Sequence, residues 1–171
     1  MPGRYLITGV AGSGKSTLER EFAARGFATV DIDNGFAEWR HADTDEPLEY
    51  TPEDAGWHEV AEWTVKKDKL QQYFDEHPEQ PVLVFGSFAR IDTVVSMFTK
   101  IILLEYPDVE TARTRIAGRP DGYGSNPHEL KRILNYIDLY QDKMKSRGAI
   151  PLLCTLPIAE LVRAIEGLID E

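Results

Sequence analysis

The chain has 171 residues, of which 42% are hydrophobic, and a formal net charge of −10. This length suits one core of ordinary size, so we expect residues 1–171 to form a single domain. The negative charge and the lack of a basic stripe exclude nucleic acid as an expected partner. No apolar run of about 18 residues and no leader pattern occurs, so we expect a cytoplasmic protein with no membrane partner, as a monomer or a homodimer.

A phosphate-binding pattern lies near the start of the chain. Residues 9–16 satisfy G-x-x-x-x-G-K-[ST], after an apolar run at 4–8 that predicts a strand and before a helical pattern at 15–25. A glycine-rich loop lets several backbone N–H groups converge on phosphate oxygens, and the helix N-terminus adds its dipole. Lys15 is placed to reach the β and γ phosphates, and Ser16 to offer its hydroxyl to Mg²⁺. The pattern therefore predicts binding of ATP with Mg²⁺. The residues expected around the nucleotide phosphates are Gly9, Ala11, Gly12, Ser13, Gly14, Lys15, Ser16 and Thr17.

Two carboxylates lie at the end of the second expected strand, residues 27–32. Asp31 and Asp33 are two residues apart, so at the end of a strand their side chains point the same way. The third expected strand, 81–87, ends in Gly86 and Ser87 instead of the acid that usually holds Mg²⁺ through water. The magnesium carboxylate must therefore come from elsewhere, and we expect Asp31 and Asp33 to supply it together with the Ser16 hydroxyl.

An acidic insertion, residues 34–78, separates these two strands. Residues 34–50 show no periodicity and are predicted to be irregular. Thr51 has the character of a helix N-cap with Pro52 in the first turn, which predicts a helix that runs, with a break, to about residue 76. We therefore expect a helical insertion that binds the acceptor of the phosphate.

All three tryptophans, Trp39, Trp57 and Trp63, fall in this insertion. Two interpretations remain open. The rings either form a satellite core of the insertion, or at least one of them, assigned here as Trp57, lines the site of a flat or sugar-like acceptor.

The second half of the chain predicts two more strands, at 101–104 and 150–154. Helices are expected after Asp108, from Asn126 to Gly148, and after residues 155–157. Residues 118–127 are too rich in glycine for a rigid element and are predicted to be a mobile lid. Arg119 lies at the root of this lid, where the transferred phosphate needs a cation.

These features give the chain a resemblance to the small P-loop kinases, among them adenylate kinase, shikimate kinase and gluconate kinase. The resemblance covers nearly the whole chain and is closest to bacterial adenylate-kinase-like ATP-binding proteins whose acceptor is generally not assigned. It implies an α/β, three-layer P-loop NTPase fold: a parallel five-stranded sheet in the order 2-3-1-4-5 with helices on both faces. The residues that carry it are Gly9–Thr17, Asp31, Asp33, Gly86, Ser87, Arg119, Tyr123 and Gly124.

The same resemblance implies roles for individual residues. Shikimate kinase also lacks the usual acid after strand three, and it uses a pair similar to Asp31 and Asp33 for magnesium and for the acceptor hydroxyl. Arg115 corresponds to an arginine that lies against the adenine in these kinases. Thr155 and Pro157 are expected beside the nucleotide.

Two classes of function follow. The first is a phosphotransferase that moves the γ-phosphate of ATP to a hydroxyl of a small molecule, with Lys15, Asp33 and Arg119 as catalytic residues. The second is a nucleotide-dependent switch or ATPase that has no small-molecule acceptor. An N-K-x-D guanine signature is absent from the sequence, which weakens a GTPase interpretation.

The charge distribution bears on the acceptor. Residues 34–62 carry nine acidic side chains and one base, Arg40. They would repel an acceptor that already bears a phosphate, unless Arg40 and Arg90 together compensated its charge. We therefore expect an uncharged acceptor such as a nucleoside or a sugar, and the alternative is a nucleoside monophosphate held by Arg40 and Arg90. The residues expected at the acceptor are Asp33, Arg40, Trp57, Gly86, Ser87 and Arg90.

Overall fold

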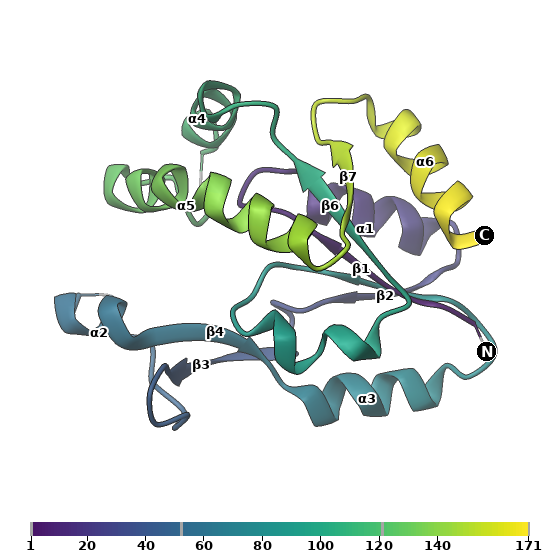
Figure 1. The fold of residues 1–171 in the computed structure, drawn as a ribbon, viewed down its shortest axis with the longest axis horizontal. Coiled ribbons are helices and arrows are strands. Elements are labelled where there is room, and N and C mark those ends of the chain that lie inside the picture. Colours follow the sequence, from purple (N-terminus) through teal and green to yellow (C-terminus); the bar gives the residue numbers. More distant parts are fainter. Residues whose placement is uncertain (1, 52, 121, 171) are drawn as a thin grey trace.

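The structure, a computed structural model, describes residues 2–51, 53–120 and 122–170. A five-stranded sheet forms its centre, and a smaller two-stranded sheet lies to one side (Figure 1). The strands are β1 (Arg4–Thr8), β2 (Ala28–Asp31), β3 (Ala37–His41), β4 (Ala61–Val65), β5 (Val82–Phe85), β6 (Lys100–Glu105) and β7 (Ile150–Leu153). The helices are α1 (Lys15–Ala24), α2 (Ala55–Val60), α3 (Lys67–Glu76), α4 (Val109–Ala117), α5 (Pro127–Ser146) and α6 (Ile158–Asp170), with short 3-10 helices η1 (Ile91–Thr93) and η2 (Val95–Met97).

The central sheet has the order β2-β5-β1-β6-β7, and each neighbouring pair is parallel. When only its own strands are counted, this is the expected order 2-3-1-4-5; the labels differ because the insertion contributes β3 and β4. Leu6 in the central strand pairs with Val84 of β5 on one side and with Ile101 of β6 on the other. Parallel strands of this kind bring their carboxyl ends to one edge of the sheet, where α/β proteins bind ligands.

Side chains of β1 contact helices on both faces of the sheet. The Tyr5 hydroxyl donates to the carbonyl oxygen of Ile169 in α6 at 3.0 Å, whereas the Thr8 hydroxyl lies 2.5 Å from the hydroxyl of Tyr140 in α5. Residues three apart on a strand point to opposite faces, so α5 and α6 cover opposite sides. Figure 1 shows the same layers, with α6 near α1 and with α4 next to α5.

The core follows from the apolar runs in the strands. All four residues of β5 are buried, as expected of a strand with helices on both of its faces. Helix α1 contributes Leu18 and Phe22, four residues apart on one helical face and both 0% exposed. The Phe22 ring lies 6.3 Å from that of Phe85, which joins this helix to the centre of the sheet.

The insertion is not purely helical: β3 lies in the segment that was predicted to be irregular, and β4 interrupts the predicted helix and includes Trp63. β3 and β4 pair in antiparallel fashion, with Trp39 opposite Trp63. Because α2 lies between the two strands in sequence, no short turn signal marks the pairing. The structure confirms the predicted helix in two parts, α2 and α3, with strand β4 between them.

The helix start expected at Thr51 was also wrong. Helix α2 begins at Ala55, and its N-cap is Asp54, whose carboxylate accepts a hydrogen bond from the N–H of Gly56 at 2.9 Å. A carboxylate at this position accepts a hydrogen bond from a free N–H group and interacts favourably with the positive end of the helix dipole. Pro52 lies outside the described residues.

The second half of the chain agrees with its predicted elements. Asp108 caps α4 by accepting from the Thr111 N–H at 2.7 Å, and Asn126 caps α5 by accepting from the Glu129 N–H at 2.9 Å. The segment 118–127, predicted to be a lid, connects these two helices, and its Asp121 lies outside the described residues. No helix in the described part of the chain is long and apolar enough to cross a membrane.

Candidate active site

The phosphate loop connects β1 to α1, as the sequence predicted. Gly14, the N-cap of α1, has a φ of +98°, a left-handed conformation that favours glycine. Its carbonyl oxygen accepts from the Leu18 N–H at 3.0 Å, which starts the helix. Within the described ranges, no side chain caps this helix end. The N–H groups of the first turn can therefore bind an anion.

Lys15 folds back over this loop. Its Nζ donates to the carbonyl oxygens of Gly9 at 2.5 Å and Val10 at 3.1 Å. The hydroxyl of the fully buried Ser13 lies 3.4 Å from the same nitrogen. The ammonium group is thus held at the mouth of the loop, where the phosphates of a nucleotide would meet it.

The candidate catalytic groups lie within electrostatic reach of Lys15. Burial lowers the pKa of Lys15 to about 8. The Asp33 carboxylate opposes this shift in the pKa, the Arg119 guanidinium adds to it, and the Asp31 carboxylate opposes it more weakly. The fold therefore brings together four side chains that the sequence placed on three separate segments.

Asp31 and Asp33 form a turn at the carboxyl end of β2. The Asp33 N–H donates to Oδ1 of Asp31 at 3.0 Å. Burial raises the pKa of Asp31 despite this hydrogen bond, and the nearby carboxylates of Asp33 and Glu19 add to the rise in the pKa. A cation at this position would relieve the repulsion between the carboxylates, which makes the turn a suitable place for Mg²⁺.

Gly86 supports this turn from the neighbouring strand. Its N–H donates to the carbonyl oxygen of Ile7 at 3.1 Å, and a Cβ at this position would lie only 2.0 Å from Cγ1 of Ile32. Only glycine permits this close approach without displacing the residue between the two aspartates. Ser87, which follows, is half-buried. The predicted contact of Gly86 and Ser87 with the acceptor stays a prediction.

Arg119 lies against the phosphate loop. Its Cδ is 3.8 Å from the position that a Cβ on Gly12 would take, and its Nη1 donates to the carbonyl oxygen of Tyr123 at 3.4 Å. The Tyr123 carbonyl oxygen therefore helps to hold this guanidinium beside the loop that is expected to bind the phosphates. Its catalytic role stays a prediction.

Arg115 lies one helical turn before Arg119 and contacts the segment after β7. Its Nη1 donates to the carbonyl oxygen of Cys154 at 2.8 Å. The next residues along the chain, Thr155 and Pro157, are exposed. Three residues expected beside the nucleotide base thus come from two segments that the fold places together.

Arg40 and Arg90 are held by acidic side chains of the insertion itself. Arg90 Nε lies 2.5 Å from Oε2 of Glu62, and its Nη1 lies 2.5 Å from Oδ1 of Asp45. Arg40 Nε lies 2.8 Å from Oε1 of Glu38. The sequence showed an excess of acids around Arg40 but could not show that these acids pair with Arg40 and with the distant Arg90.

The tryptophans divide into two kinds of environment. Trp57 is only 7% exposed, and its indole N–H donates to the carbonyl oxygen of Glu49 at 2.8 Å, which is typical of a core residue. The Trp39 ring lies 4.8 Å from that of Trp57 and 5.0 Å from that of Trp63. Trp63 instead donates its N–H to Oδ1 of Asp33 at 2.9 Å. Trp63, and not Trp57, is the tryptophan bound to a candidate catalytic residue.

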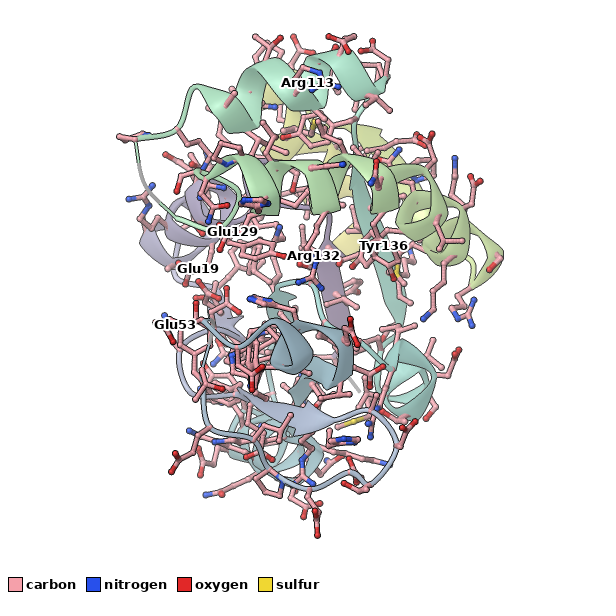
Figure 2. All side chains as sticks on the ribbon, turned by 90° about the vertical axis from the view of Figure 1, so that its left-hand side faces the viewer. Glu19, Glu53, Arg113, Glu129, Arg132 and Tyr136 are labelled. Carbon is pink, nitrogen blue, oxygen red and sulfur yellow. The ribbon has the colours of Figure 1, made fainter. Side chains whose placement is uncertain are left out.

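Sequence reasoning missed Arg132 on α5. Its Nη2 donates to the carbonyl oxygen of His58 in α2 at 3.2 Å, so it reaches from α5 to the insertion. Figure 2 shows Arg132 and Tyr136 between these two parts of the molecule. Burial raises the pKa of Tyr136, and the Glu62 carboxylate adds to this, which places β4 close to the same helix face. The spacing of Glu129, Arg132 and Tyr136 on one face of the helix was the signal that could have identified them.

The residues present fit a shared magnesium site. Among the described residues, no three His, Cys, Asp or Glu side chains gather into a site that would hold a metal ion by themselves. Mg²⁺ in nucleotide sites usually keeps several waters and takes one or two carboxylates together with phosphate oxygens. Ser16 at the start of α1 and the Asp31 and Asp33 turn supply the oxygen ligands that such a site needs.

Comparison with known proteins gives structural matches only. No protein-family model matches the chain, and no curated protein matches it significantly. A sugar kinase from Janibacter sp. is 16% identical, with a TM-score of 0.57 over 99% of this chain and 95% of that one. Shikimate kinase from Acinetobacter baumannii in complex with shikimate is 18% identical, with a TM-score of 0.57 over 99% and 94%. Deoxyadenosine kinase from M. mycoides with bound dATP is 15% identical, with a TM-score of 0.53 over 99% and 100%.

At these identities the matches are evidence about the fold. They cover nearly the whole chain, so they include both its parallel sheet and the loop that follows the central strand. The chain therefore has the fold of the small P-loop kinases.

Proposed function

We propose that this protein is an ATP- and Mg²⁺-dependent phosphotransferase that moves the γ-phosphate to a hydroxyl of a small uncharged molecule. The observation that carries the proposal is the convergence of Lys15, Asp33 and Arg119 near the carboxyl edge of a parallel sheet. Similarity to solved structures described as sugar kinase and shikimate kinase supports it.

The nucleotide would lie along the phosphate loop, with its base toward Arg115 and residues 155–157. The N–H groups at the start of α1 and the Lys15 ammonium neutralise the phosphates. Mg²⁺ would supply additional positive charge at the transferring phosphate, held by the Ser16 hydroxyl and, through water, by Asp31. Asp33, which is bonded to the insertion through Trp63, is left for the acceptor.

The chemical step is an in-line displacement. The acceptor oxygen bonds to the γ-phosphorus while the bond from that phosphorus to the β–γ bridging oxygen breaks, and ADP leaves with the electron pair. The Asp33 carboxylate orients the acceptor hydroxyl and takes its proton. Lys15 and Arg119 stabilise the charge that spreads over the phosphoryl oxygens.

An uncharged acceptor suits the ion pairs of the insertion. Arg40 and Arg90 are engaged by Glu38, Glu62 and Asp45, so a phosphate on the acceptor would have to break these pairs before it could bind either arginine. It would also meet the remaining negative charge of the segment. A nucleoside or a sugar would meet neither cost.

The position of Arg132 favours the alternative, a nucleoside monophosphate kinase. Its guanidinium faces the insertion and donates to a backbone carbonyl oxygen, which a phosphate on the acceptor could replace. A preference for monophosphates that disappears in Arg132→Ala would establish this alternative and would leave the kinase reaction itself in place.

The proposal is tested by a pooled metabolite screen with labelled ATP and Mg²⁺, in which transfer of label to a hydroxyl compound is the expected result. Arg113→Ala is the matched control, because Arg113 is exposed and pairs with Glu110 on the outer surface of α4. Hydrolysis of ATP that no small molecule stimulates would instead favour the switch or ATPase interpretation.

A further inference from the structure

The indole of Trp63 is bonded to a group that our proposed mechanism uses. Its Nε1 donates to Oδ1 of Asp33 at 2.9 Å. Trp63 lies in the middle of β4, and Asp33 follows β2 in the other sheet, so the bond joins the insertion to the carboxyl edge of the central sheet. Neither sheet needs this bond for its own pairing.

The position of Trp63 is fixed from several sides. In the β3–β4 pair it lies opposite Trp39, whose ring is 5.0 Å away at an angle of 53°. Its carbonyl oxygen accepts from the Ala89 N–H at 2.8 Å, in the loop that follows β5. The ring therefore offers its N–H at a set place, whereas the Asp33 side chain is exposed at the end of a turn.

This bond occupies one oxygen of the Asp33 carboxylate. Oδ1 receives the indole N–H, and Oδ2 is left to accept a hydrogen bond from a hydroxyl. An aspartate without such a partner would divide its time among several rotamers, and only some of them would direct an oxygen at the acceptor. Fixing the rotamer in advance removes this entropic cost from the reaction.

Trp57 shows how a purely structural tryptophan is placed in the same insertion. It is more deeply buried, and its N–H is satisfied by a backbone carbonyl oxygen, at Glu49. Trp63 is only half-buried, and its N–H meets a carboxylate next to the phosphate loop. Packing of the hairpin requires an apolar ring at position 63 but does not require its nitrogen.

We propose that Trp63 is a positioning residue for Asp33: its indole N–H holds Oδ1 so that Oδ2 faces the hydroxyl that receives the phosphate. This inference rests on the proposed function and adds a residue to it. It also gives the insertion a part in catalysis, because the β3–β4 pair sets the direction of the candidate base.

The contact is tested first by the indole signals in ¹⁵N–¹H spectra, which do not depend on activity. The chain has three tryptophans, so three such signals are expected, and Trp63→Phe identifies the one from Trp63. Asp33→Ala should shift the Trp63 signal well beyond those of Trp39 and Trp57. An unmoved Trp63 signal in Asp33→Ala would overturn the proposal.

The effect on catalysis is tested by a double-mutant cycle on single-turnover hydrolysis of MgATP, with the protein in excess and water as the acceptor. Trp63→Phe keeps the ring and removes the hydrogen bond, and should lower the hydrolysis rate about tenfold while the dissociation constant of MgATP stays the same. In the Asp33→Ala background the same change should have no further effect. Arg113→Ala, the exposed control on α4, should behave as wild type.

Three outcomes separate this proposal from the proposed function. If Lys15→Ala abolishes hydrolysis but Trp63→Phe does not slow it, the phosphotransferase stands and the role of Trp63 is overturned. Equal losses from Trp63→Phe with and without Asp33 would show a structural ring and would also overturn it. If hydrolysis is undiminished in Lys15→Ala, the proposed function itself fails.

Discussion

Arg90 and Glu62 form an ion pair with 2.5 Å between Nε and Oε2. Arg90 follows β5 and has a left-handed φ of +57°, whereas Glu62 lies in β4, so the pair ties the insertion to the carboxyl edge of the central sheet. Arg90 also donates to the carbonyl oxygens of His41 and Ala42 at 3.0 and 3.1 Å. The arginine that the sequence assigned to the acceptor thus also holds the insertion in place, and its contact with an acceptor stays a prediction.

The Lys15 ammonium should be essential for turnover. Lys15→Ala leaves the backbone of the loop intact but removes a cation that faces the transferring phosphate, so phosphoryl transfer should fall by about 10²–10³-fold or more while the fold is kept. Turnover and circular dichroism measured on the same preparation check this. Undiminished turnover would contradict the phosphotransferase assignment.

Nucleotide binding should weaken as the pH rises above about 8, the pKa of Lys15 in the structure. Bound phosphates favour the charged lysine, so below this pH the cation is already present, and above it each binding event must take up a proton. The affinity for ATP in EDTA should then fall by about tenfold per pH unit. Isothermal titration calorimetry from about one pH unit below this pKa to about one unit above it measures the change in affinity. Lys15→Arg stays charged and should show a flat profile over the same range. An equally steep decline in that variant would assign the effect to another group.

Arg119 should act mainly in the transition state. Arg119→Ala should lower kcat by about 10²-fold or more, with a much smaller change in the dissociation constant of ATP, because the lid cation meets charge that develops during transfer. Rapid-quench kinetics and equilibrium binding separate the two quantities. Arg113→Ala, on the outer face of α4, the helix that precedes Arg119, is the matched control. A loss confined to ATP affinity would make Arg119 a binding residue.

An uncharged acceptor should be preferred to a phosphorylated one. A nucleoside and its monophosphate are offered side by side with MgATP. The nucleoside should have the higher kcat/KM by about tenfold, because the phosphate of the monophosphate would be repelled by the acidic insertion. Asp33→Asn should abolish transfer to the preferred compound. Preference for the monophosphate, lost in Arg40→Ala, would overturn the expectation and would mean that the Arg40–Glu38 pair opens during binding.

Gly86 should be intolerant of any side chain. A Cβ would come within 2.0 Å of Ile32, so Gly86→Ala should lower the free energy of unfolding by about 1–3 kcal/mol and displace the Asp31 and Asp33 turn. Gly167→Ala is the control, because nothing lies within 4 Å of its Cβ position in α6, and it should be neutral or slightly stabilising. Denaturant unfolding of both variants tests this. Equal stabilities would show that Ile32 has room to move.

Local features of the sequence determined the central sheet and the phosphate loop. The apolar runs predicted all five of its strands, and β5, which is buried along its whole length, shows why a strand covered on both faces must be apolar. The loop was predictable because the glycines and Lys15 act through backbone geometry within eight residues. Asp31 and Asp33 could be identified because they lie where the second apolar run ends, although Asp33 is in the turn after β2 and not on the extended strand.

The tertiary structure decided the insertion and the partners of its side chains. The pairing of Trp39 with Trp63 depends on the register of two strands that α2 separates, and no local pattern contains that register. Arg90 is distant in sequence from the acids of the insertion, and the fold brings Glu62 and Asp45 to it. The bond from Trp63 to Asp33 arises in the same way, because a hydrogen bond between distant segments exists only after packing has brought donor and acceptor to 2.9 Å.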